Sequence, residues 1–381
     1  MFGGRRQVLG GFMAFGLFWG AWGAVLPAVQ RSSGSTDGEL GTALLMIGLG
    51  ALLSMRLTGR LVDRVGAGVL PVVMALFGAA GVLPAFANSP LALAAALLLL
   101  GAASGATDVA INLAHAWFSV SVVLASLGTT GLRAAGAGPP RVLEAVFVLI
   151  ALIAVFALTP GVPRTRDESG HGATCPAPDA SAPRRGKSRW LPAPPLIAFG
   201  CLCGLAYVVE NAWQSWGAVH LETTLHASGG LSSTAPAVFA SAAAAGRFAG
   251  NALVRCFDPI RLLSVGALTA GAGTLVAADA ATPWIGLAGI AVAGLGTSVC
   301  APTVISLAGA WAGPAQRGAA VSTVTTIAYL GFLVGPAGVG LAASLTSLPT
   351  ALAGVAFVAV LLAVSAPAAS WATRWRRIHP P

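Results

Sequence analysis

The chain has 381 residues, of which 56% are hydrophobic and 9% are charged, and its mean hydropathy is +0.83. Soluble proteins carry a charge on roughly 25% of their residues, so this composition excludes a set of soluble globular domains. The net charge of +9 is spread between apolar runs, which argues against a basic face that binds nucleic acid. The sequence therefore predicts an all-α integral membrane protein whose surroundings are a lipid bilayer.

Twelve apolar runs are long enough to cross a bilayer, which takes about 20 residues of helix. They cover residues 8–29, 39–58, 69–88, 90–112, 116–137, 142–160, 192–218, 230–253, 260–279, 283–309, 318–340 and 347–368. The first run exceeds the apolar part of a signal peptide and many runs follow it, so we interpret it as an uncleaved span. Only a short stretch around Ala114–Trp117 separates the fourth run from the fifth.

The basic residues predict how these spans are oriented. If the N-terminus is cytoplasmic, 18 of the 21 Arg and Lys residues fall in cytoplasmic connections, helix ends or termini. Only Arg31, Arg133 and Arg141 then fall on the outer side. We therefore expect a multi-pass protein with both termini in the cytoplasm.

A repeat divides the chain into two halves. Residues 161–190 are rich in Pro, Gly, Ser and charge and are expected to form a cytoplasmic linker between an N-terminal half, 1–160, and a C-terminal half, 191–381, with a basic tail. The motif Trp19-Gly-Ala-Trp22-Gly-Ala-Val recurs as Trp213-Gln-Ser-Trp216-Gly-Ala-Val, and Gly101 has its counterpart in Gly294 at almost the same offset. Both tryptophan motifs run outward, so the halves are parallel repeats of six helices, a plan that places a substrate site between them near the midplane.

The stretch Gly59-Arg-Leu-Val-Asp63-Arg64-Val-Gly66, between the second and third spans, resembles the signature of the major facilitator superfamily. Four further stretches resemble the bacterial branch of that superfamily that contains the membrane proteins MosC and YbjJ: 18–27, 105–112, 210–216 and 329–336. The resemblance implies a monomeric secondary active transporter in the bacterial inner membrane. Such a transporter moves a small molecule by alternating access and can be coupled to protons.

The same resemblance assigns a cytoplasmic gate to the signature, whose glycines permit a tight turn and close helix approach. It implies that Asp63 contacts a helix N-terminus in the other half, where the helix dipole favours an anion. Asp108, near the inner end of the fourth span, is expected to pair with Arg64 or its neighbour Arg60 and to hold this gate closed; the alternatives are a structural acid at the helix end and a substrate contact. The predicted gating residues are Gly59, Asp63, Arg64, Gly66 and Asp108.

Glu210 is an acid deep in the apolar seventh run, where an ionised side chain costs about 2.5–3.5 kcal/mol. It could carry a proton, bind a cationic or hydroxylated substrate, or serve as a structural acid bonded to its neighbours. Trp213 and Gln214 lie three and four residues further on, so they share its helix face, and Asn211 adjoins it. We predict that this face lines a central cavity.

Trp19 and Trp22 lie on one face of the first span and are expected to stack on a sugar-like or aromatic substrate, the alternative being plain packing or interfacial tryptophans. Asn112 completes the predicted substrate or proton-coupling residues. The sequence contains no phosphate-binding loop, catalytic triad or supported metal cluster, so we expect neither an enzyme nor a bound cofactor or metal.

Two other functions remain open at this level. The second half has Arg255 and Cys256 where the signature would place Asp and Arg, and the fourth connection is short. These features suggest, as the alternative to transport, a membrane sensor or scaffold that uses the same fold. A passive pore is the weakest alternative, because no filter or ring of charges is evident.

Overall fold

The computed structural model of the chain describes residues 2–65, 69–111, 116–158, 194–312 and 316–367. Throughout these residues the secondary structure is helical, with two short irregular turns, the 3-10 turn η2 (Leu83–Phe86) and the π-helical turn η3 (His220–Thr224). The first half contains α1 (Phe2–Ser33), α2 (Asp37–Val65), α3 (Val69–Val82), α4 (Pro90–Ile111), α5 (Ala116–Ala134) and α6 (Pro139–Leu158). The second contains α7 (Pro194–Val219), α8 (Gly229–Ser232), α9 (Ala235–Cys256), α10 (Pro259–Ala278), α11 (Pro283–Thr297), α12 (Cys300–Ala312), α13 (Arg317–Leu345) and α14 (Leu348–Ser365).

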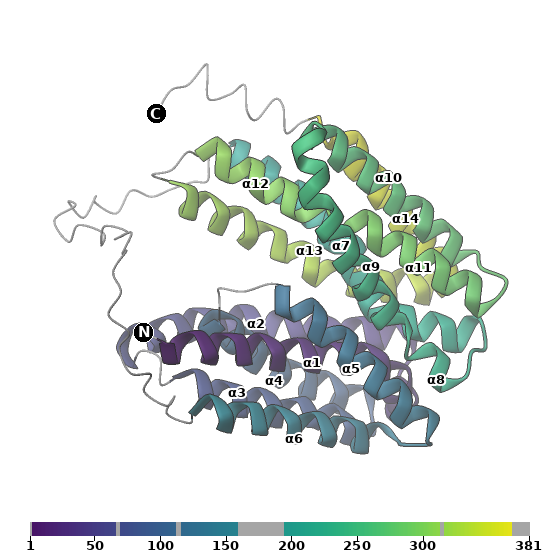
Figure 1. The fold of residues 1–381 in the computed structure, drawn as a ribbon. Coiled ribbons are helices and arrows are strands. Elements are labelled where there is room, and N and C mark those ends of the chain that lie inside the picture. The colour runs from purple at the N-terminus through teal and green to yellow at the C-terminus, as the bar shows by residue number, and fades with distance from the viewer. Residues whose placement is uncertain (1, 66–68, 112–115, 159–193, 313–315, 368–381) are drawn as a thin grey trace.

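The two halves form separate bundles that repeat one packing pattern (Figure 1). In the first half α1 packs on α5 and α6, and in the second α7 packs on α13 and α14. The pair α2 and α4 corresponds to α9 and α11, and the contacts of α3 with α4 and α6 correspond to those of α10 with α11 and α14. Between the halves, α2 packs on α13 and α5 on α9, as symmetry between repeats requires. The prediction of twelve membrane helices in two six-helix repeats is confirmed.

Gly101 and Gly294, the glycine landmarks of the repeat, have the same packing role. A Cβ on Gly101 of α4 would lie 2.0 Å from the carbonyl oxygen of Ile47 on α2. A Cβ on Gly294 of α11 would lie 2.7 Å from the carbonyl oxygen of Phe239 on α9. Both helix pairs approach closely enough that only glycine fits at the contact.

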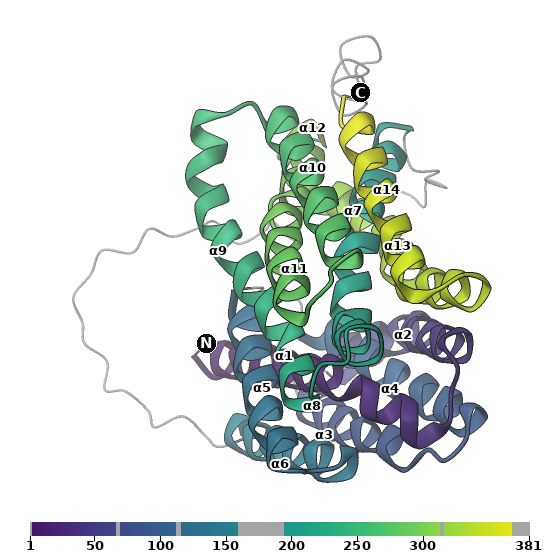
Figure 2. The ribbon, with the colours of Figure 1, turned by 90° about the vertical axis from the view of Figure 1, so that its right-hand side faces the viewer.

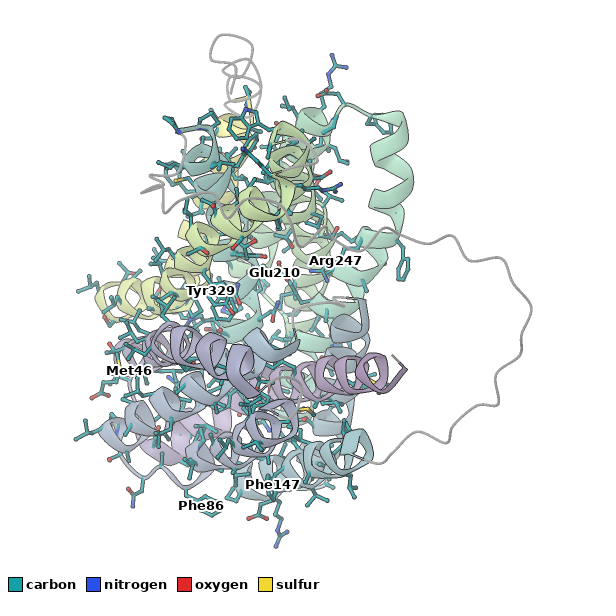
Figure 3. The ribbon with its side chains drawn as sticks, turned by 90° about the vertical axis from the view of Figure 1, so that its left-hand side faces the viewer. Met46, Phe86, Phe147, Glu210, Arg247 and Tyr329 are labelled. Atoms are coloured by element: carbon teal, nitrogen blue, oxygen red, sulfur yellow. The ribbon has the colours of Figure 1, made fainter. Side chains whose placement is uncertain are left out.

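The outer surface of the bundles is apolar, as a lipid-facing surface must be. Eight helical segments in the described residues are long and apolar enough to cross a membrane. Large apolar side chains such as Leu91 and Leu345 are more than four-fifths exposed. Phe86 and Phe147 lie at the lower edge of the N-terminal half, away from the other half (Figure 3). Exposed apolar surface of this extent is suited to hydrocarbon and not to water.

Three elements differ from the sequence-based boundaries. The tenth run, expected over 283–309, is broken between α11 and α12, because Pro302 has no N–H for the Ser298 carbonyl and its ring would clash there in a continuous helix. The eighth run begins with the separate turn α8. Helix α2 continues through Val65, so the stretch from Gly59 to Arg64 is helical, and the expected tight turn is wrong for these residues.

The start of α2 is fixed by a capping box. The Thr36 N–H donates to Glu39 Oε2 at 2.8 Å, and the Glu39 N–H donates to Thr36 Oγ1 at 3.3 Å. This reciprocal arrangement satisfies two backbone donors that the first turn of a helix leaves unpaired. It also fixes the first turn of α2 beside α13, at one end of the interface between the halves.

Candidate substrate site

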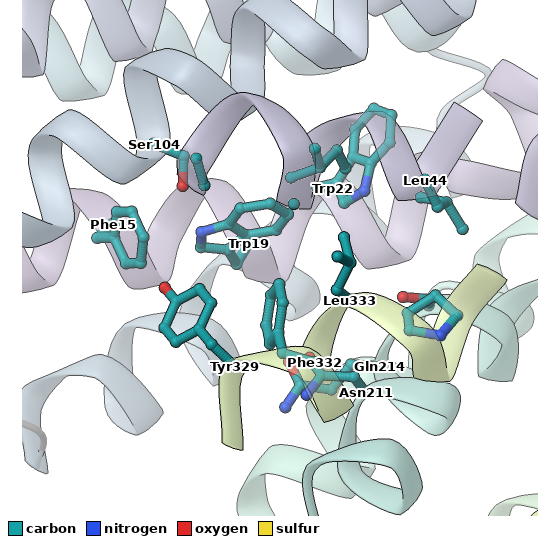
Figure 4. Close-up of a pocket in the computed structure, with 15 residues that line it drawn as sticks. Phe15, Trp19, Trp22, Leu44, Ser104, Asn211, Gln214, Tyr329, Phe332 and Leu333 are labelled. Carbon is teal, nitrogen blue, oxygen red and sulfur yellow. The ribbon is translucent and has the colours of Figure 1, made fainter. Parts of the chain in front are cut away.

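A cavity of about 100 Å³ lies between the two halves near the middle of the helices (Figure 4). One water molecule needs about 10–15 Å³ measured this way, so the cavity has room for a small organic molecule. Helices α1, α2 and α4 line it from the first half, and α7 and α13 from the second. Its lining consists of Phe15, Trp19, Trp22, Leu44, Ile47, Gly48, Ala51, Ser104, Asn211, Gln214, Ser215, Tyr329, Phe332, Leu333 and Pro336.

Aromatic rings form two sides of this cavity. Trp19 and Trp22 come from α1, as the sequence predicts for one helix face, and Phe18 packs behind them with its ring centroid 5.4 Å from Trp19 and 6.3 Å from Trp22. On α13, Tyr329 and Phe332 lie with ring centroids 5.5 Å apart. Trp19 and Tyr329 face each other across the cavity (Figure 4). Rings held in this way offer flat apolar faces to a bound molecule.

The polar side of the cavity belongs to α7. Asn211, Gln214 and Ser215 line it, and Asn211 Nδ2 donates to the Tyr207 carbonyl at 2.9 Å. The Gln214 Nε2 donates to Glu210 Oε1 at 3.2 Å. The lining contains no Asp, Glu, Lys or Arg among the described residues.

Glu210 lies one helical turn from Gln214, outside the cavity lining. Its carboxylate pairs with Arg247 of α9, with Arg247 Nη2 at 3.2 Å from Glu210 Oε1 and the side chains 16% and 37% exposed (Figure 3). Sequence reasoning missed this pair, because it assigned Arg247 to the inner end of the eighth run with the other cytoplasmic arginines. The sequence did contain an indication of the pair. Arg247 lies inside the apolar run 230–253 and not at its end, and an arginine within a membrane span usually needs a partner.

Trp213 and Trp216, the tryptophan pair of the second half, do not line the cavity as Trp19 and Trp22 do. Trp213 is fully buried and its Nε1 donates to Thr274 Oγ1 at 2.9 Å. Trp216 is also fully buried, and its Nε1 donates to the Pro336 carbonyl at 2.9 Å. The structure thus brings Asn211 and Gln214 to the cavity and packs Trp213 inside the C-terminal half. Trp213 and Gln214 are consecutive residues, yet one lies in the protein core and the other lines the cavity. Spacing in the sequence does not distinguish these two environments.

An ion-pair cluster joins the halves at the end where α1 ends and α2 begins, which is the outer end in the predicted orientation. Arg133 of α5 and Glu222 of η3 form its centre, with Arg133 Nη2 at 2.9 Å from Glu222 Oε2 and side chains only 6% and 11% exposed. Arg31 also pairs with Glu222. Ser232 Oγ donates to Glu222 Oε2 at 2.5 Å, and Arg133 Nη1 donates to Ser233 Oγ at 2.8 Å. We call these five residues the outer latch.

A close helix contact accompanies the outer latch. A Cβ on Gly41 of α2 would lie 2.8 Å from Gly340 Cα of α13, and a Cβ on Gly340 would lie 2.5 Å from Gly41 Cα. Seen from this end, α8 of the C-terminal half lies beside α5 of the N-terminal half (Figure 2). Arg31 and Arg133 are two of the three basic residues that the orientation rule leaves outside, and a partner across the interface explains their position.

The predicted gating residues are only partly described. Gly59, Asp63 and Arg64 belong to the last two turns of α2, and Asp108 belongs to the last turn of α4. Gly66 and Asn112 lie outside the described residues, as does the expected linker. The cytoplasmic gate therefore stays a prediction. In the described residues no cluster of three or more His, Cys, Asp or Glu is arranged to hold a metal ion.

Comparison with known proteins gives matches over most of the chain. Residues 199–380 match the model of the Major Facilitator Superfamily. The chain is 30% identical to an uncharacterised transporter of this superfamily from Yersinia pestis, over 78% of each chain. It is 27% identical to membrane protein MosC of Rhizobium meliloti, over 77% of this chain and 73% of that protein. The branch inferred from sequence is thereby supported.

Solved structures show the same fold. A bacterial homologue of the human lysosomal transporter Spinster, solved in an inward-facing and unoccupied conformation, matches with a TM-score of 0.76 at 15% identity, over 100% of this chain and 98% of that one. A D-xylose–proton symporter matches with a TM-score of 0.68 at 14% identity, over 95% and 96%. At these identities the likeness concerns the fold alone.

Proposed function

Because the chain belongs to the major facilitator superfamily, it is a bacterial multi-pass membrane transporter, and we propose that it couples substrate movement to protons through Glu210. Family membership identifies secondary transport of a small molecule by alternating access and gives no support to the sensor or scaffold alternative. The family consists of transporters and not of enzymes. We further propose that the protein works as a monomer in the inner membrane with cytoplasmic termini.

One observation carries the coupling proposal. The Glu210 carboxylate contacts both Arg247 and Gln214, and Gln214 lines the cavity. A proton on Glu210 removes the charge that compensates Arg247, and it leaves the Gln214 amide with a neutral acceptor, which binds it more weakly than the carboxylate does. Protonation therefore changes the cavity lining and the contact between α7 and α9 at the same time. A direct link of this kind between a proton and a substrate site is what coupled transport requires.

The distribution of contacts between the two halves supports our proposal that this conformation is inward-open. Hydrogen bonds and the ion pairs between the halves gather at the outer latch, and the ribbons of the halves diverge toward the opposite end (Figure 1). In the predicted orientation that opposite end is cytoplasmic. Alternating access then requires that the outer latch opens when the inner ends close.

The coupling proposal is tested with Glu210→Gln, which keeps the size and hydrogen bonding of the side chain and removes its titration. Purified protein is screened by thermal shift against sugars, polyols and amines, and the best ligand is followed in sealed vesicles. We expect the variant to lose accumulation driven by a pH gradient while it retains exchange of substrate at equal concentrations. Loss of both activities would assign Glu210 to direct substrate binding. Retention of both would overturn the proposal.

A further inference from the structure

The two tryptophan pairs of the repeat differ in what their indole N–H groups contact. Those of Trp213 and Trp216 are bonded within the C-terminal half. Trp19 and Trp22 line the cavity, and their N–H groups donate to no described residue. Neither nitrogen belongs to the set of fully enclosed polar atoms without a partner. Because an indole N–H can only donate, the cavity presents two open donors from α1.

The wall formed by α7 supplies the complementary groups. Asn211 and Gln214 use their amide nitrogens on Tyr207 and Glu210, so their carbonyl oxygens stay free as acceptors toward the cavity. Ser215 adds a hydroxyl, which donates and accepts. A ligand that fits both walls must accept hydrogen bonds on one side and donate them on the other. Hydroxyl groups do both.

The charge of the site restricts the ligand further. No described lining residue is charged, and a bound ion would lose its hydration without gaining a counter-charge, which is costly. Glu210, the acid bonded to the lining residue Gln214, is already engaged by Arg247. The aromatic faces of Trp19 and Tyr329 favour a ring with a flat apolar side. A purely apolar ligand would leave both indole donors unpaired, which also costs free energy.

We propose that the cavity binds an uncharged ring molecule with several hydroxyl groups, a monosaccharide or cyclitol. Its hydroxyl oxygens accept from the N–H groups of Trp19 and Trp22, and its hydroxyl protons go to the carbonyl oxygens of Asn211 and Gln214. The inference rests on the proposed function and names its substrate class. Through Gln214 the ligand contacts the residue that is bonded to Glu210.

The test measures binding to purified full-length protein by isothermal titration calorimetry. The neutral probes are D-glucose, D-xylose and myo-inositol, and the charged probes are D-glucosamine and D-glucuronate. We expect at least one neutral probe to bind more tightly than both charged probes. Trp19→Phe and Trp22→Phe keep a ring and remove the donor, so each should weaken that binding about 3- to 10-fold.

Trp213→Phe is the matched control from the second repeat. It removes the bond to Thr274 and should lower the melting temperature without changing affinity, and thermal melts verify that all variants are folded. No neutral binder, tighter binding of a charged probe, or unchanged affinity in both Trp19→Phe and Trp22→Phe would overturn the inference. Binding of a neutral probe by a protein that shows no pH-driven accumulation would refute the proposed coupling and leave the substrate class intact.

Discussion

Glu210 and Arg247 form an ion pair of intermediate exposure, at 16% and 37%. An exposed pair contributes about 0–1 kcal/mol, whereas removing one partner of a fully buried pair costs about 3–5 kcal/mol. This pair lies between those limits. The pair links α7 to α9, and a proton on Glu210 would remove one of its two charges.

Arg247→Gln should therefore destabilise the protein by about 1–2 kcal/mol, because it leaves the Glu210 carboxylate without its cation. The double variant Glu210→Gln/Arg247→Gln leaves no unpaired charge and should cost less than the two single changes added together. Unfolding of the wild type and the three variants in one detergent measures the coupling. If the costs simply add, the two side chains do not interact.

At the scale of the helices, the contact between Gly41 and Gly340 holds α2 against α13. Gly340→Ala places a methyl group where α2 has backbone atoms, so the outer end should close less completely. Gly338→Ala is the matched control, since it lies on the same helix and a Cβ there meets nothing within 4 Å.

Access to the cavity from outside measures this closure. The cavity residue Ser104 is changed to Cys in a chain without its native cysteines and labelled in intact cells with an impermeant maleimide. Gly340→Ala should raise the labelling rate several-fold, and Gly338→Ala should leave it unchanged. Equal rates in all three proteins would mean that this glycine contact does not control closure.

Much of the helical architecture follows from the sequence, because each membrane span can be recognised from its own apolar residues and the arginines that flank it. The twelve spans, the two repeats and the helix face that carries Trp19 and Trp22 are of this kind. The break before α12 depends on Pro302 and one backbone carbonyl, a local detail that mean hydropathy does not reveal. Trp213 points into its own bundle and not to the cavity. It is fully buried and its indole N–H donates to Thr274 of α10. This tertiary contact cannot be read from helix periodicity.

At the scale of the whole molecule, the two repeats have acquired different roles. The N-terminal half provides the tryptophans and the C-terminal half provides the amides and the Glu210–Arg247 pair. Contacts between the halves are the part that sequence reasoning could not supply. Arg133 and Glu222 are 89 residues apart, and only the unusual outer position of the arginine indicated that it needs a partner.

We propose that the protein alternates between two states and that the outer latch keeps the outer end closed in the inward-open state. Double electron–electron resonance measures it directly, with spin labels at Thr42 and Thr346 for the outer ends and at Val72 and Gln316 for the inner ends. All four side chains are exposed. Glu222→Gln removes the charge that holds Arg31 and Arg133. We expect this variant to add a population in which the outer distance is longer and the inner distance is shorter. An outer distance that stays the same, or that lengthens without a shorter inner distance, would contradict it.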